Sequence, residues 1–199
     1  MRIPTRREFA SALLALCFAV AAPVRAAGFD LQALMQQLAQ VRSGQAVFEE
    51  DRRVQQLDQT IRSTGRLSFT APDTFVRETL KPRHERMAVV GTQLTLSRGE
   101  RSRSTTLDSV PEAVVIVEAI RGTLTGNGET LQRYFDTSVQ GSPEQWQLEL
   151  VPRDARLRGQ VTYLRVSGRQ NQVREVRMTM ADGDTSVMRI DPVEATTKP

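Results

Sequence analysis

Few side chains in this 199-residue chain could carry out chemistry, and they do not form a recognisable catalytic set. His84 is the only histidine, and it lies in the polar segment 81–86, which predicts a surface position. A zinc site at His84 would need carboxylates for its other ligands, which is rare. A serine hydrolase would need His84 as its base, but the chain has no Gly-x-Ser-x-Gly element. We therefore predict no catalytic residue, no metal site and no cofactor, and a hydrolase is the least favoured function.

Two short segments resemble ligand-binding loops but lack the rest of the pattern. Gly126-Asn127-Gly128 is too short to surround a phosphate, so we interpret it as a turn or a helix cap. Asp182-Gly183-Asp184 lacks the further ligand positions of a calcium loop, so we interpret it as a hairpin turn. No carboxylate pair stands out elsewhere. The sequence therefore singles out no set of residues for catalysis.

The first 26 residues have the order of a secretory signal peptide. Arg2, Arg6 and Arg7 precede an apolar run of 13 residues, 10–22, and Ala26 provides a small residue for cleavage. The run is too short to span a bilayer comfortably, and the alternative is an N-terminal anchor that is never cut. Because Arg6-Arg7 also resembles a twin-arginine signal, the export route is either Sec or twin-arginine. Both routes predict the periplasm.

The single cysteine lies within this signal. Cys17 follows Leu16, whereas a lipidated cysteine needs a small residue before it. We therefore expect no lipid anchor, and the chain after the signal has no thiol nucleophile and no disulfide.

Most of the net charge also lies in the signal. Of the 27 basic and 23 acidic residues, four arginines and one glutamate lie in residues 1–26, which leaves 23 basic and 22 acidic residues and a net charge of +1. The remaining arginines are spread along the chain, without the clustering of a phosphate-binding face, so we predict no nucleic-acid partner. The rest of the chain suits one domain, 27–190, with a short polar tail, 191–199, that is expected to be flexible. No apolar span long enough to cross a bilayer remains, which predicts a soluble product.

The spacing of apolar residues predicts one helix and then a series of strands. A stripe from Leu31 to Val41 predicts a helix that Asp30 caps and Ser43-Gly44 ends. The period then changes to two, although the charged stretch 49–53 is expected to be an exposed turn. Turns are also expected at Gly91-Thr92 and Gly168. The predicted strands are 46–48, 65–70, 75–80, 87–90, 94–96, 146–150, 161–166, 173–180 and 185–190.

A different kind of segment separates the two groups of strands. Ser109 and Glu112 have the spacing of a capping box, with Pro111 in the first turn of the helix that would follow. Residues 113–120 are apolar nearly all round, so a helix here must be covered on most of its surface. A strand is the alternative, because β-branched residues are weak helix formers. Residues 129–135 predict a second, short helix.

Together these elements predict a mainly β fold of the α+β class, with a strongly curved antiparallel sheet or an open barrel. The insert could fill the concave face as an ordinary core, and the pattern alone favours this alternative. It could instead cover an apolar hollow that leaves room for a ligand. Periodicity does not separate these two possibilities.

In order and spacing, several short segments resemble the periplasmic lipoprotein carrier family LolA. They are VRSGQAVF (41–48), GRLSFTAPDTF (65–75), Lys81-Pro82, VGTQL (90–94), LELVP (148–152) and DGDT (182–185). The resemblance covers about residues 31–190. It implies an unclosed, strongly curved antiparallel barrel with an N-terminal helix and a helical lid, which hold acyl chains between them.

The resemblance implies that apolar side chains form a lipid-binding cavity and its lid. The cavity candidates are Phe48, Leu67, Phe69, Phe75, Met87, Leu94, Leu96, Val176, Met178 and Met180, and the lid candidates are Val114, Val115, Ile116 and Ile120. The client would be a lipoprotein or another acylated envelope component. A monomeric carrier would take it from an inner-membrane donor to an outer-membrane acceptor.

Two departures from the family concern the lid and the cavity. In family carriers an arginine holds the lid shut, and it stands just before the proline that corresponds to Pro72. Here that position is Ala71. The family also has an aromatic residue shortly after the phenylalanine that corresponds to Phe75, and here that position is Arg77. The client is therefore expected to differ from an ordinary triacylated lipoprotein. The alternatives are an envelope adaptor with a filled core and a LolB-like outer-membrane acceptor, which should carry a lipidated cysteine that Cys17 fits poorly.

Overall fold

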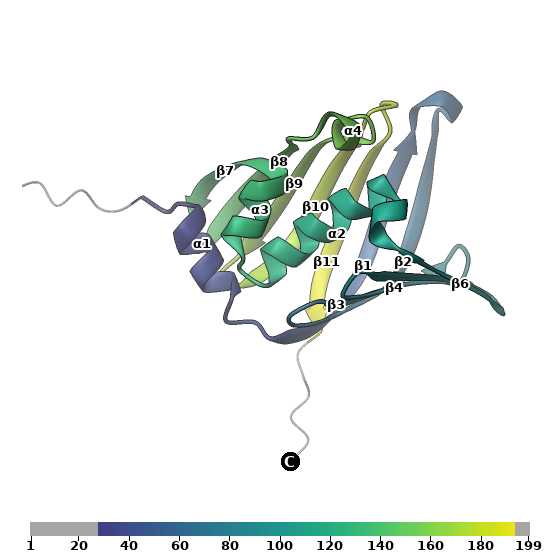
Figure 1. Ribbon diagram of the computed structural model, residues 1–199, viewed down its shortest axis with the longest axis horizontal. Coiled ribbons are helices and arrows are strands. Elements are labelled where there is room, and N and C mark those ends of the chain that lie inside the picture. The colour runs from purple at the N-terminus through teal and green to yellow at the C-terminus, as the bar shows by residue number, and fades with distance from the viewer. Residues whose placement is uncertain (1–27, 194–199) are drawn as a thin grey trace, which may run out of the picture.

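The computed structural model describes residues 28–193 as one curled antiparallel sheet with helices against its concave face (Figure 1). The strand order is β6-β5-β4-β3-β2-β1-β11-β10-β9-β8-β7, so β6 and β7 are unpaired edges and the barrel is unclosed. This confirms the predicted fold class. The strands are β1 Ser43–Val54, β2 Gln59–Thr70, β3 Thr74–Lys81, β4 Glu85–Val90, β5 Gln93–Arg98, β6 Arg101–Thr106, β7 Phe135–Ser142, β8 Gln145–Pro152, β9 Val161–Arg169, β10 Gln172–Met180 and β11 Thr185–Val193.

Four helices accompany the sheet. In Figure 1, α1 and α3 lie in front of β7–β10, and α2 crosses the hollow towards β3–β6, which turn underneath it. The helices are α1 Leu31–Leu38, α2 Pro111–Leu124, α3 Gly128–Tyr134 and α4 Ala155–Arg158, with short 3-10 turns at Gln55–Leu57 and Leu107–Ser109. The curl of the sheet thus encloses α2 from both sides.

The first helix begins as predicted and ends earlier. The carboxylate of Asp30 accepts a hydrogen bond from the backbone N–H of Ala33 at 2.9 Å, which caps the helix. The helix ends at Leu38 rather than Val41, because β1 already starts at Ser43 and the chain must turn between them.

The apolar insert forms helix α2, which settles the choice between helix and strand. The predicted capping box was wrong. Val110 is the N-cap, and the Ser109 hydroxyl pairs with the hydroxyl of Thr106 at 3.0 Å. Pro111 is the first helical residue, where its missing N–H costs nothing. The helix also continues through Gly122 to Leu124, because Leu131 of α3 packs on the space that Gly122 leaves.

The largest correction to the predicted strands concerns residues 49–53, which form the middle of β1 and not a turn. Side chains continue to alternate between the two faces of the sheet through this stretch. The residues that point to the concave face are Glu50 and Arg52, and each is paired with an oppositely charged side chain. Gly168 also lies inside β9, against the indole of Trp146. The sequence missed β6, β7, the start of β2 and α4, which have few alternating apolar residues.

The turn and tail predictions had different outcomes. Gly91 and Gly183 have positive φ angles of 57° and 90° in the β4–β5 and β10–β11 turns, as expected for hairpins. Asn127 caps α3, as the Gly-Asn-Gly segment predicted. The tail was expected to begin at Asp191, but β11 continues to Val193, because Asp191 pairs with Val47 of β1. Residues 1–27 and 194–199, which include the predicted signal, lie outside the described residues.

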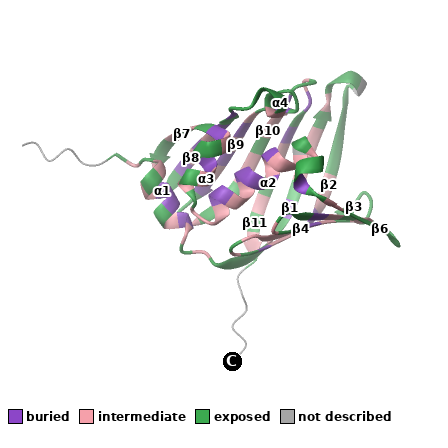
Figure 2. Cartoon of the chain, viewed as in Figure 1, coloured by how far each residue is buried: buried purple, intermediate pink, exposed green. Residues whose placement is uncertain are grey.

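The core is divided into two clusters, and both involve α2 (Figure 2). The large cluster lies between α1, α2, α3 and strands β7–β10, and it contains the fully buried Trp146 and Phe135. The small cluster lies between α2 and the β4–β5 hairpin and consists of Val89, Leu94, Leu107 and Val117. Helix α2 therefore bridges the two arms of the sheet.

Candidate functional site

An apolar band lies between the two clusters on the concave face. The register places Leu67 and Met87 on either side of β3, and Val176 and Met178 side by side along β10 on the same face. All four are half-buried, and Leu96 at the open end of the band is 44% exposed. Partly uncovered apolar surface inside a curled sheet is a candidate binding surface.

The register puts all ten cavity candidates from the sequence on this concave face. Their burial divides them into three groups. Phe48, Phe69, Leu94 and Met180 are buried; Leu67, Phe75, Met87, Val176 and Met178 are half-buried; Leu96 is exposed. The half-buried group and Leu96 have surface left to offer a ligand, whereas the buried group is already packed.

The lid candidates divide between the two clusters. Val115 is fully buried in the large cluster, and Val114 packs against the small one. Ile116 and Ile120 are half-buried. Ile120 faces Phe69 and Phe75 across a space of about 10 Å³, about the volume that one water needs. In this closed arrangement α2 therefore leaves no room for an acyl chain below Ile120.

A wider cleft of about 380 Å³ opens between the start of α2, the end of α3 and α4. Its apolar walls touch both clusters. Val114 packs against the small cluster, and Tyr134 and Leu157 pack against the large one. Its rim has both signs of charge, with Asp108, Arg133, Asp154 and Arg156. The cleft thus marks where the two halves of the core separate.

Arg121 ties α2 to the sheet. Its Nη2 donates a hydrogen bond of 2.5 Å to the carbonyl oxygen of Gly91 in the β4–β5 turn, and its Nη1 pairs with Glu118 at 2.8 Å. Glu118 is only 8% exposed. Arg121 also lines the small space beside Pro72, next to the position where Ala71 stands instead of an arginine. The charged side chain that joins α2 to the sheet therefore comes from α2.

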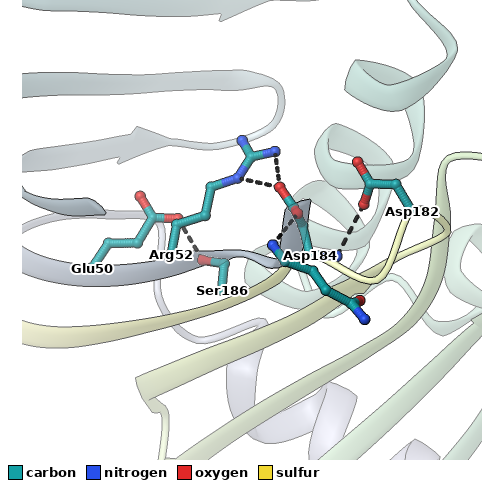
Figure 3. Close-up of polar contacts among 6 residues, drawn as sticks. Glu50, Arg52, Asp182, Asp184 and Ser186 are labelled. Atoms are coloured by element: carbon teal, nitrogen blue, oxygen red, sulfur yellow. Dashed lines mark hydrogen bonds and ion pairs between the residues drawn. The ribbon is translucent and has the colours of Figure 1, made fainter. Parts of the chain in front are cut away.

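A polar cluster, which the sequence did not predict, lies on the concave face (Figure 3). Glu50 accepts hydrogen bonds from Ser63, Arg77 and Ser186, and Arg52 pairs with Asp184 at 3.0 Å. Figure 3 shows Arg52 extended towards Asp184, while Glu50 reaches Ser186 on the neighbouring strand. Glu50 and Arg52 are in phase with Ala46 and Phe48, but all five residues 49–53 are charged, so the sequence held no signal that singled these two out.

The residues weighed for catalysis lie apart from this surface. His84 is 61% exposed and lies 2.9 Å from the carboxylate of Glu78, and this hydrogen bond holds the pKa of Glu78 below its ordinary value. Within residues 28–193, no three His, Cys, Asp or Glu side chains are grouped so as to hold a metal ion. No helix in the same range is both long and apolar enough to cross a membrane.

The convex face has its own hydrogen-bonded group on β8 and β9. The hydroxyl of Tyr163 donates to Glu149 at 2.6 Å, and Arg165 contacts both side chains. The pKa of Glu149 is lowered, chiefly by the hydrogen bond from Tyr163, and the pKa of Tyr163 is raised, chiefly by burial. This group stabilises the outer side of the sheet.

The comparison with protein families agrees with this geometry. The family described as outer membrane lipoprotein carrier protein LolA-like matches residues 21–191. The chain belongs to the LolA-like family. A search of curated proteins found no match to this LolA-like chain.

Solved structures with a similar fold have little sequence in common with this LolA-like protein. A LolA superfamily protein from Nitrosomonas europaea is 9% identical over 85% of this chain and 95% of that chain, with a TM-score of 0.45. A DUF1329 family protein from Desulfovibrio piger is 9% identical over 85% and 92%, with a TM-score of 0.49. A chain of the Pseudomonas aeruginosa MucA/MucB complex is 13% identical over 84% and 59%, with a TM-score of 0.45. The family assignment therefore rests on the sequence match.

Proposed function

We propose that this protein is a periplasmic carrier that binds the acyl chains of a lipoprotein, or of another lipidated envelope component, between the concave face and α2. The observation that carries the proposal is the apolar band between the two clusters, which stays partly uncovered in a chain of this family. In this proposal residues 1–26 are a cleaved signal peptide. The monomeric carrier receives its client from an inner-membrane donor and delivers it to an outer-membrane acceptor, without catalysing a reaction.

The need for an apolar surface follows from the cost of exposing hydrocarbon. Burial of each methylene contributes about 0.8 kcal/mol, so a 16-carbon chain costs on the order of 12 kcal/mol to hold in water. The exposed and half-buried side chains of the band could replace part of the bilayer. The side chains now buried under α2, such as Phe69 and Leu94, would supply the rest once α2 moves.

Movement of α2 is a necessary part of this function. The space beneath Ile120 holds about 10 Å³, so an acyl chain can enter only when the helix leaves the sheet. The hydrogen bond from Arg121 to Gly91 opposes that movement. We assign to Arg121 the role of holding the lid closed, which in the family belongs to an arginine at the position of Ala71.

The same closed packing favours a second function, an envelope adaptor with a filled core that binds a protein partner and no lipid. The two functions differ in what the purified protein takes up. A carrier binds a fluorescent fatty-acid probe at about one per protein, and native mass spectrometry of protein taken from the periplasm shows an added lipid mass. Absence of both signals supports the adaptor.

A pair of matched variants tests whether the probe binds on the concave face. Leu96 is 44% exposed on that face, and Val90 is 56% exposed on the opposite face of the same hairpin. We expect Leu96→Asp to weaken probe binding at least tenfold and Val90→Asp to leave it unchanged, because only the first puts a charge against the bound chain. Equal effects of both variants would contradict binding in the hollow.

A further inference from the structure

Charged residues interrupt the apolar band where a hydrocarbon chain alone would have no use for them. Arg77 stands on β3 between Leu67 of β2 and Met87 of β4. Its Nη2 lies 2.5 Å from Glu50, and its guanidinium carbon lies 4.9 Å from the centre of the Phe48 ring. Desolvation of such a pair costs free energy that replacement by apolar residues would avoid. The pair therefore points to a ligand with a polar part.

The hydrogen bonds of this cluster show which polar group is missing. Both oxygens of Glu50 accept from side chains, and both oxygens of Asp184 are occupied by Arg52 and by the backbone N–H of Gln55. A guanidinium carries five N–H donors. Among the described residues Arg77 uses only Nη2, because its Nε is buried without a partner, out of a ligand's reach, while its Nη1 makes no hydrogen bond. The unused capacity is a donor, so the matching ligand group is an acceptor.

The charge of the cluster narrows the kind of acceptor. Two arginines and two carboxylates, Arg52, Arg77, Glu50 and Asp184, sum to zero, so the cluster has no excess positive charge to attract an anion. A neutral carbonyl oxygen fits this balance better than a phosphate or a free carboxylate. The Arg77 side chain is 29% exposed, and its unpaired Nη1 is not among the buried atoms, so a ligand in the hollow could reach it.

We propose that Arg77 donates a hydrogen bond to the carbonyl oxygen of the acyl linkage, the ester or amide that joins a fatty chain to the polar part of the client. This inference rests on the proposed carrier function. The contact fixes how far the chain enters the hollow, because the linkage stops at Arg77 while the hydrocarbon extends from there along the apolar band.

The test compares two probes that have the same labelled chain, one a methyl ester and the other the hydrocarbon without the ester. We expect the purified protein to bind the ester about tenfold more tightly, which corresponds to about 1.4 kcal/mol. The double variant Glu50→Gln/Arg77→Met removes both charges together and leaves no donor at position 77, whereas Glu50→Gln alone keeps the Arg77 donors. The double variant should lose the preference for the ester, and Glu50→Gln should keep it. Arg66→Met, on the exposed face of β2, is a second control and should also keep the preference.

Each outcome separates this inference from the proposed function. Failure of the unaltered protein to bind either probe would overturn the carrier function itself. Equal binding of both probes by the unaltered protein, or a preference that survives in Glu50→Gln/Arg77→Met, would overturn the role of Arg77 and leave the carrier function intact. If that variant does not fold by urea unfolding, Glu50→Gln/Arg77→Leu replaces it, since leucine also has no donor. A preference retained in that variant would equally overturn the role of Arg77.

Discussion

Loss of the hydrogen bond from Arg121 to Gly91 should release α2 without unfolding the sheet. A hydrogen bond to a charged group contributes about 1.5–3 kcal/mol. Since 1.4 kcal/mol is a factor of ten, the equilibrium between closed and open lid should shift by about ten- to hundredfold. Arg121→Met keeps much of the apolar stem and removes both donors that the structure uses.

The variant needs a partner, because Arg121 also pairs with the buried Glu118. A lone buried carboxylate would destabilise the helix by itself. We therefore compare the double variant Glu118→Met/Arg121→Met with the single variant Glu118→Met. Neither has a charge or an acceptor oxygen in the side chain at position 118, so the bond from Arg121 to that side chain is absent from both and their difference reports the contact with Gly91.

Hydrogen exchange measured by mass spectrometry is the assay, with stopped-flow uptake of a fatty-acid probe as the functional measurement. In the double variant we expect the amides of α2 to exchange about ten- to hundredfold faster, since local opening sets their rate. Amides of β8 and β9 should be unchanged, and probe uptake should be faster. Unchanged protection of α2, or equal loss of protection in α2 and β8, would refute the role of Arg121 as a lid contact.

Three further predictions concern the stability of the sheet. Gly168→Ala should destabilise the protein by about 1–3 kcal/mol in urea unfolding, because a Cβ there would overlap the neighbouring indole; an unchanged midpoint would contradict this packing. Asp184→Asn should cost about 1–3 kcal/mol by losing the charge that Arg52 pairs with, and the loss should be absent when Arg52 is already methionine. The hydrogen bond from Tyr163 lowers the pKa of Glu149, so its stabilisation is present above the ordinary glutamate pKa and is lost as the pH falls through the folded value. Glu149→Gln should therefore lower the unfolding midpoint at neutral pH and have little effect in acid, and a constant difference at all pH values would argue against this linkage.

The sequence predicted the fold wherever apolar alternation reports burial directly. Strands such as β8 and β10 alternate between the core and the convex face, so their existence and inward faces followed from period two. The apolar helix between the two halves was predicted because a segment with so little polar surface must be covered. The succession of short antiparallel strands with one apolar face also predicted a strongly curved sheet or an open barrel, and the resemblance to the LolA family narrowed this to an unclosed barrel with a helix across it.

The sequence was misleading where charges face inward. Glu50 and Arg52 looked like an exposed turn, because their partners Arg77, Ser186 and Asp184 lie up to 136 residues away in the chain. Burial of such residues depends on pairing, which no local pattern reveals. The edge strand β6 was missed for a related reason, since an edge strand that is mostly exposed has no apolar face to detect.

The unequal size of the two clusters has a consequence for the direction in which the molecule can open. Helix α2 contributes Val115 and Ala119 to a cluster of fourteen buried residues, but only Val117 to a cluster of four. Fewer buried side chains must separate when the helix parts from the β4–β5 hairpin than when it parts from the opposite arm. If α2 moves as the proposed carrier function requires, we expect it to pivot on the α3 side and to admit hydrocarbon between α2 and the hairpin.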